Sequence, residues 1–197
     1  MTLKHLLLAF TFSGISLFSL AQEVPQAKKD NKKIQEVVTL DPAPQAEGDT
    51  GVAKPLAQSE ILKRALNFIR LENAKYAKSN ILNVGSKAEC VATFNYKPKE
   101  LNPQSSVEGT YSMHLSIEAK DGKYRYTISK INHTAKNSEY TGGDIYNEVP
   151  ACGSMKLSTP IWKQMKSQAL KDATTLIADL KEGMKNFSNV DPTKDEW

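Results

Sequence analysis

The sequence predicts an α+β domain built on a single antiparallel sheet of four to five strands, with two helices packed on its apolar face. Two observations lead to this fold class: a β-hairpin over residues 109–131 and amphipathic helical patterns over residues 55–72 and 158–187. In chain order, the expected elements are one strand, one helix, four strands and one helix. The apolar faces of both helices need a partner, and the apolar face of the sheet is the one available.

The hairpin register follows from its turn. Asp121-Gly122 is a preferred dipeptide for a two-residue type I′ turn, in which both positions have positive φ. This turn places Glu118 opposite Arg125 on a solvated face, and it makes the other face apolar. A slip of one residue would mix the two faces, so turn and pattern agree. The apolar face comprises Tyr111, Met113, Leu115, Ile117, Ala119, Tyr124, Tyr126 and Ile128.

Three further strands are expected outside the hairpin. Residues 34–40 are rich in β-branched side chains and form a candidate first strand. Residues 81–84 and 89–96 form two more, separated by a Gly-Ser break. Residues 132–158 read as a long irregular segment, and connections of this length in a compact domain are usually functional or disordered.

Each helix has a recognisable start. Ser59, followed by Glu60, is expected to cap the first helix through its hydroxyl group. The last helix should begin at Ser158 or Thr159, with Pro160 in the first helical position. Its apolar stripe is long enough to cover a sheet face and comprises Trp162, Met165, Ala169, Ala173, Leu176, Leu180, Met184 and Phe187.

The first 21 residues have the pattern of a secretory signal peptide. Lys4 precedes an apolar stretch at 6–20, and Ser19 and Ala21 are the small residues expected before a cleavage site. The stretch is too short for a membrane-spanning helix, so no span is expected after cleavage. We therefore expect an exported protein, periplasmic or secreted, whose mature chain begins at Gln22.

The remaining sequence divides into three parts. Residues 22–54 should be mostly disordered apart from the candidate strand at 34–40, residues 55–187 should form the α+β domain, and residues 188–197 a polar tail. The chain has 26 basic and 22 acidic residues, a formal net charge of +4. These basic residues are scattered along the chain rather than clustered with aromatic residues, which argues against a nucleic-acid partner.

Several of these features together resemble a known family. They are the first strand, the helix start at Ser59–Leu62 with Arg64-Ala65, the hairpin sequence KDGKYRYTIS at 120–129, and the amphipathic C-terminal helix. They resemble a family of secreted bacterial domains of unknown function described as having a TATA-binding-protein-like (TBP-like) fold. The resemblance covers residues 34–187. It implies a curved antiparallel sheet backed by two helices, but neither DNA binding nor any catalytic residue, because fold does not carry function.

No pattern in the sequence predicts a metal, cofactor or catalytic site. His114 and His133 lack the ligand spacing of a zinc site and are expected to be solvated strand residues. No GxSxG, P-loop or GxGxxG motif occurs. Cys90 and Cys152 could form a disulfide in an exported protein or remain two free thiols, and both alternatives stay open.

The leading functional hypothesis is a non-catalytic envelope domain that binds an unidentified protein or ligand. Tyr140, Ile145 and Tyr146 in the long segment could anchor a partner or could pack back over the sheet edge. Glu118 and Arg125 could form a charged ligand surface or a cross-strand pair that keeps the sheet soluble. Two alternatives are a small hydrolase with a site around Glu118, His114 and Asp144, and a structural part of a larger envelope assembly.

Overall fold

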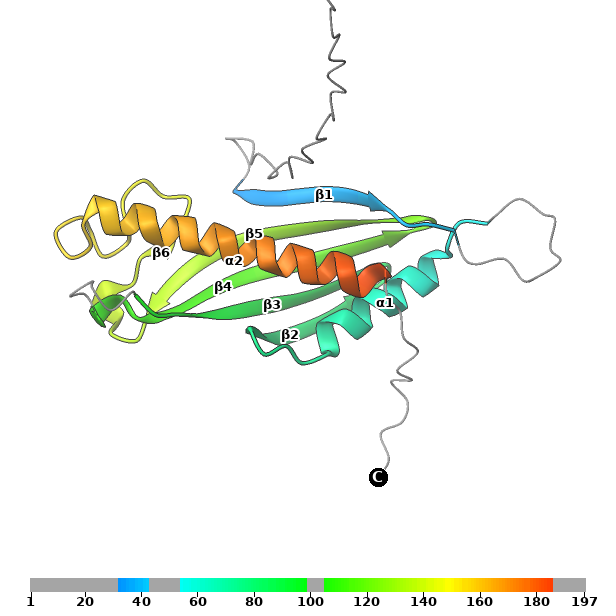
Figure 1. The fold of residues 1–197 in the computed structure, drawn as a ribbon, viewed down its shortest axis with the longest axis horizontal. Coiled ribbons are helices and arrows are strands. Elements are labelled where there is room, and N and C mark those ends of the chain that lie inside the picture. The colour runs from blue at the N-terminus through cyan, green and yellow to red at the C-terminus, as the bar shows by residue number, and fades with distance from the viewer. Residues whose placement is uncertain (1–31, 43–53, 99–104, 186–197) are drawn as a thin grey trace, which may run out of the picture.

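The computed structural model describes residues 32–42, 54–98 and 105–185. These residues form an α+β domain in which one antiparallel sheet of six strands carries both helices on one face (Figure 1). The strand order is β1-β5-β4-β3-β2, and β6 pairs with β5 beyond the end of β1. The predicted fold class is confirmed, with one strand more than expected. The strands are β1 (Lys33–Thr39), β2 (Tyr76–Val84), β3 (Lys87–Tyr96), β4 (Gly109–Lys120), β5 (Lys123–Ala135) and β6 (Gly143–Asp144).

The β4–β5 hairpin has the predicted register, but its turn is of a different type. Glu118 lies opposite Arg125 and Ile117 opposite Tyr126. Gly122 has a φ of +70°, whereas Asp121 is not among the residues with positive φ, so the turn is not type I′. The turn is held instead by its neighbours: the Gly122 N–H donates to the Leu56 carbonyl (2.8 Å), and the Gly122 carbonyl accepts from the Leu40 N–H (2.9 Å).

Helix α1 (Gln58–Arg70) is capped from the hairpin turn rather than by Ser59. Its N-cap residue is Ala57, which makes no side-chain capping bond. The Asp121 carboxylate accepts a hydrogen bond from the Gln58 N–H at 2.7 Å, so a residue 63 positions away supplies the missing acceptor. The predicted Ser59 cap is therefore wrong, because a tertiary contact satisfies the helix start that a local hydroxyl was expected to satisfy.

Helix α2 (Thr159–Lys185) begins where the sequence predicts, and the Trp162 N–H donates to the Ser158 carbonyl at 2.9 Å. It crosses the sheet and meets α1 near its C-terminal end (Figure 1). A Cβ atom at Gly183 would lie 2.9 Å from the Phe68 ring, which shows how closely the helices approach there. Phe187, at the end of the predicted stripe, lies outside the described residues.

The core lies between the two helices and the apolar face of the hairpin. Side chains of this face are 0–1% exposed, as predicted: Tyr111, Met113, Leu115, Ile117, Ala119, Tyr124, Tyr126 and Ile128. Each large apolar side chain buried in this way contributes about 1.5–3 kcal/mol. The helices contribute Ile61, Ala65, Phe68 and Ile69 from α1, and Trp162, Met165, Ala169, Ala173, Leu176, Ile177, Leu180 and Met184 from α2.

Two strand boundaries differ from the prediction by four residues or more. Strand β2 begins at Tyr76, five residues before the predicted start, and a register shift between Ser79 and Leu82 with Asn80 at a φ of +51° breaks its alternation. Strand β5 continues to Ala135 through a second irregularity in which Lys130 has a φ of +51°. The segment predicted to be irregular from residue 132 therefore begins as strand.

The candidate first strand is confirmed as β1 and joins the sheet beside β5, with Val38 opposite Tyr124. The predicted signal peptide at 1–21 and polar tail at 188–197 lie outside the described residues. Within residues 32–42, 54–98 and 105–185, no helix is long and apolar enough to cross a membrane.

Candidate functional site

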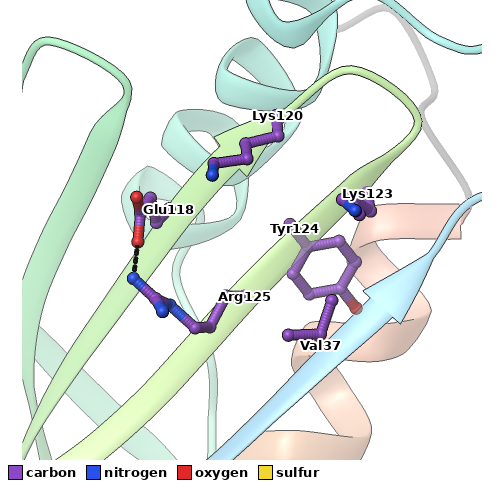
Figure 2. A pocket seen from close by; sticks show the side chains of 6 residues that line it. All are labelled: Val37, Glu118, Lys120, Lys123, Tyr124 and Arg125. Carbon is purple, nitrogen blue, oxygen red and sulfur yellow. Dashed lines mark hydrogen bonds and ion pairs between the residues drawn. The ribbon is translucent and has the colours of Figure 1, made fainter.

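The sheet has one face without helices, which we call the open face. It consists of the outward-pointing positions of β1 to β5, namely the alternate residues that include Lys33, Lys87, Glu118 and Arg125, together with Lys130 of the irregularity in β5. Figure 2 shows part of this face, with both helices behind the strands. Since the other face is the core, the open face is the largest surface of the sheet available for contact.

Two ion pairs lie on the open face. Arg125 pairs with Glu118 directly across the β4–β5 hairpin, as the predicted register requires (Figure 2). Lys87 pairs with Glu89 two residues along β3, and the pKa of the Glu89 carboxyl is lowered mainly by its hydrogen bond to the Lys87 ammonium. His114 Nε2 lies 3.6 Å from Glu89 on its other side. Glu118 and Glu89 are thus each held by a cation of the same face.

Among the described residues, two hollows lie on the open face. The larger hollow has a volume of about 640 Å³ and is lined almost entirely by polar side chains: Lys33, Gln35, Lys87, His114, Ser116, Glu118, Arg125, Thr127, Ser129 and Lys130. A smaller one of about 170 Å³ lies at the hairpin tip, shares Glu118 and Arg125 with the first, and is completed by Val37, Tyr124, Lys120 and Lys123 (Figure 2). The two hollows follow the hairpin from its tip to the irregularity at Lys130.

The predicted partner-binding residues of the long segment lie elsewhere, at the opposite end of the hairpin. Ile145 is only 2% exposed, and Tyr140 and Tyr146 are partly buried against the core. The Ile145 N–H donates to the Ile131 carbonyl at 3.1 Å, which ties the segment to β5. The sequence left two alternatives for this segment, partner anchoring or packing over the sheet edge, and Ile145 packs over the sheet. Val149 remains 56% exposed.

His133 holds this segment in place. It is 0% exposed, so the prediction of a solvated strand histidine is wrong for this residue, since its side chain points to the helix side of the sheet. Its Nδ1 accepts a hydrogen bond from the Gly142 N–H (3.1 Å), which leaves Nε2 to donate to the Val107 carbonyl (3.0 Å). Burial lowers the pKa of the imidazole, and the bond to Val107 only partly opposes this.

The disulfide between Cys90 and Cys152 is not formed, and both thiols are free. Cys90 is buried on β3 opposite Leu115, and burial raises the pKa of its thiol to about 11. Cys152 follows Ala151, whose N–H donates to the Gly142 carbonyl at the far end of β5. The sheet register places that end of β5 beside Tyr111 and Phe94. Phe94 is four residues from Cys90 on β3, a separation of about 13 Å along the strand.

The residues of the hydrolase alternative are only partly brought together. His114 and Glu118 both line the larger hollow, but they are four residues apart on β4, about 13 Å. Asp144 lies on β6 opposite Asn132, accepts from the Tyr146 N–H and pairs with Lys32. It does not line that hollow. Among the described residues, no three His, Cys, Asp or Glu side chains are grouped to hold a metal ion.

Sequence reasoning identified Glu118 and Arg125 but missed Lys33, Lys87 and Lys130 as members of the same surface. The alternation of β1 and β3 could have placed Lys33 and Lys87 on a polar face, but not next to the hairpin, because strand order is set by tertiary packing. Lys130 could not be placed, since the irregularity in β5 changes which face it joins.

An open antiparallel sheet with two helices on one face and a polar opposite face defines this chain as an α+β domain of TBP-like fold. No family model and no curated protein matches the sequence. Two solved bacterial structures share the fold. A TBP-like protein from Parabacteroides distasonis ATCC 8503 is 12% identical, with a TM-score of 0.52 over 79% of this chain and 94% of that one.

The second is a DUF4468 family protein from Bacteroides ovatus ATCC 8483, 11% identical, with a TM-score of 0.50 over 80% of this chain and 88% of that one. Both agree with the family resemblance seen in the sequence, and the fold that this resemblance implied is confirmed. At these identities the similarity concerns the fold alone.

Proposed function

We propose that this chain is an exported, non-catalytic binding domain that uses the open face to bind a partner in the cell envelope. The observation that carries the proposal is the contrast between the two faces of one sheet. One face is covered by α1 and α2, with the hairpin side chains there 0–1% exposed. The other face is bare and has a mostly polar hollow of about 640 Å³, with Val37, Leu82 and Val84 exposed on the same face. Uncovered, hollowed surfaces on a rigid scaffold are common sites of recognition.

Export rests on the signal-peptide pattern of the first 21 residues. A non-catalytic role rests on the spread of the titratable groups of the open face, where Glu89 and Glu118 are both held by cations. Ser116 and His114 both lie near Glu89, but Glu89 is held by the Lys87 ammonium, and among the described residues no hydrogen bond joins the Ser116 hydroxyl to His114. A ligand surface is therefore favoured over the hydrolase alternative.

The test is affinity capture from a native envelope extract with three matched variants. Thr127→Tyr adds a ring to the middle of the open face, Val149→Tyr adds the same ring to the long segment, and Thr174→Tyr adds it to the outer side of α2. We expect the partner to be lost only with Thr127→Tyr. Loss with Val149→Tyr instead, or retention by all three variants, contradicts the proposal.

Deleting the long segment would be a poorer test. Residues 136–149 include Ile145, a member of the core, and Gly142, whose N–H bonds to His133. Their removal would leave the buried His133 Nδ1 without its N–H donor and expose the core, so a lost partner could reflect unfolding. Single surface substitutions avoid this ambiguity.

A further inference from the structure

We infer that the open face binds an acidic segment of a partner polypeptide, laid in extended form along β5. This inference rests on the proposed function and adds the chemical class of the ligand. It is carried by the charge balance of the face, by lysines that have no ion-pair partner among the described residues, by the shape of the hollow and by the kinds of side chain that the face presents.

The positive charge of the protein is concentrated on this face. The open face has six cationic side chains and two acidic ones, an excess of four positive charges. The whole chain has 26 basic and 22 acidic residues, the same excess, so all other residues together are balanced at 20 of each sign. The cationic residues are Lys33, Lys87, Lys120, Lys123, Arg125 and Lys130, and the acidic ones are Glu89 and Glu118.

Four of these cations have no ion-pair partner among the described residues: Lys33, Lys120, Lys123 and Lys130. Lys120 and Lys123 are paired directly across the hairpin, an arrangement that repels. Such a pair destabilises the free protein, and an anionic ligand would relieve the repulsion. The smaller hollow between these lysines and Val37 is open to such a group (Figure 2).

The cations form a stripe rather than a cluster. Lys123, Arg125 and Lys130 follow one another along β5, and Lys33 lies beside this line opposite Ser129. Seven residue steps along a strand span about 23 Å, the length of an extended peptide of about seven residues. Because the face is hollowed over about 640 Å³, it fits a chain better than the plane of a membrane.

The side chains of the face favour carboxylates on a polypeptide. None of the strand residues that point to the open face in the described ranges is Phe, Tyr or Trp, and Tyr124, which lines the smaller hollow, is only 1% exposed. Bases and sugar rings therefore have no exposed ring to stack on. The one arginine on the described part of the face already pairs with Glu118 through Nη2, so it is less available to phosphate than an unpaired guanidinium would be. Ser129 lines the larger hollow and provides a hydroxyl group that can bond to peptide groups.

The test is fluorescence anisotropy of a labelled glutamate oligomer of about ten residues, long enough to exceed the stripe. The mature wild-type chain is compared with the triple variant Lys33→Gln, Lys123→Gln, Lys130→Gln and with a control triple, Lys163→Gln, Lys171→Gln, Lys185→Gln, on the exposed side of α2. Both variants lose three charges. We expect roughly tenfold weaker binding for the first triple and less than about twofold for the control.

Equal weakening by both triples would show attraction to net charge alone and would overturn the inference. Tighter binding, at matched charge, to polyphosphate or to phosphatidylglycerol vesicles than to the glutamate oligomer would overturn the choice of a polypeptide.

Failure of the proposed function is a separate result: the envelope partner would then be retained by Thr127→Tyr. A partner lost with Thr127→Tyr but kept by the open-face triple would reject the acidic ligand and leave the binding surface standing.

Discussion

The buried environment of His133 could not be read from its local sequence. Val107 and Gly142, its two hydrogen-bond partners, are 26 and nine positions away, and neither could be identified from spacing. Position 142 has no room for a side chain, because a Cβ atom there would lie 2.5 Å from the Trp162 ring and 3.2 Å from His133 Nδ1. The histidine thus links three segments that the sequence analysis treated separately.

Replacing His133 with Phe should destabilise the protein by about 2–5 kcal/mol, because the buried Gly142 N–H and Val107 carbonyl would both lose their partner. Urea denaturation at pH 7.5 measures the change in the free energy of unfolding. The control is His114→Gln on the open face, which should change it by less than about 0.5 kcal/mol. Similar losses for the two variants would contradict the structural role of His133.

The stability of the wild-type protein should also fall as the pH is lowered through 6.5. The pKa of His133 is lowered in the folded state, so below about pH 6.5 the unfolded chain binds a proton that the folded protein does not. This contribution is fully present above pH 6.5, declines below it, and stops changing once the pH is below the folded-state pKa. The His133→Phe variant should lack this part of the pH dependence in urea titrations between pH 7.5 and 5, whereas His114→Gln should retain it.

At the scale of elements, the parts predicted well are those whose signals are local. The hairpin register followed from a turn and alternating residues, and the start of α2 from Ser158 and Pro160. The parts predicted wrongly depend on contacts between elements. The turn of the hairpin and the cap of α1 are a single structure, in which Asp121 bonds to Gln58 and Gly122 to Leu56. Local propensity could not reveal that the hairpin turn and the start of α1 satisfy each other's backbone hydrogen-bonding groups.

Asp121→Ala should cost about 0.5–2 kcal/mol, because it removes the acceptor for the first N–H of α1. Asp121→Asn should cost only a few tenths of a kcal/mol, since an amide oxygen caps almost as well and Asn is also favoured in turns. Thermal or urea unfolding of both variants measures the difference. Equal losses of stability in the two variants would contradict the capping role of the Asp121 side-chain oxygen.

Lys120→Glu should stabilise the hairpin by about 0.2–1 kcal/mol, because it replaces a like-charged cross-strand pair with an opposite one. The same change should weaken binding of the glutamate oligomer. Urea denaturation gives the first effect and anisotropy the second, with Lys171→Glu on α2 as the control for charge. A loss of stability in Lys120→Glu would mean that Lys120 and Lys123 do not repel each other in the free protein.

At the scale of the whole molecule, the sequence predicted the layers and the bare polar face, but not which strands share it. Glu118 and Arg125 were placed by one hairpin, whereas Lys33 and Lys87 reached the same face only through the strand order β1-β5-β4-β3. For the long segment the sequence left two alternatives open, partner anchoring or packing over the sheet edge, and Ile145 lies in the core. Long-range pairing is the information that a pattern of single residues does not contain.

Expression of the full-length chain in a bacterial host should yield a protein that begins at Gln22, because residues 1–21 match a cleaved signal peptide. Intact-mass measurement on the periplasmic or secreted fraction checks this. A Leu8→Arg variant, with a charge in the apolar stretch, should remain in the cytosol with its first 21 residues attached. Recovery of wild-type protein from the cytosol at full length would reject export.

The central claim is that the open face is the surface with which this protein binds its partner. Site-specific photo-crosslinking in intact cells tests it most directly, with a photoreactive residue placed at Thr127 on the open face or at Thr174 on the outer side of α2. The proposed function predicts a discrete crosslinked product from position 127 and none from position 174. Crosslinking from position 174 alone, or from neither position, would contradict it.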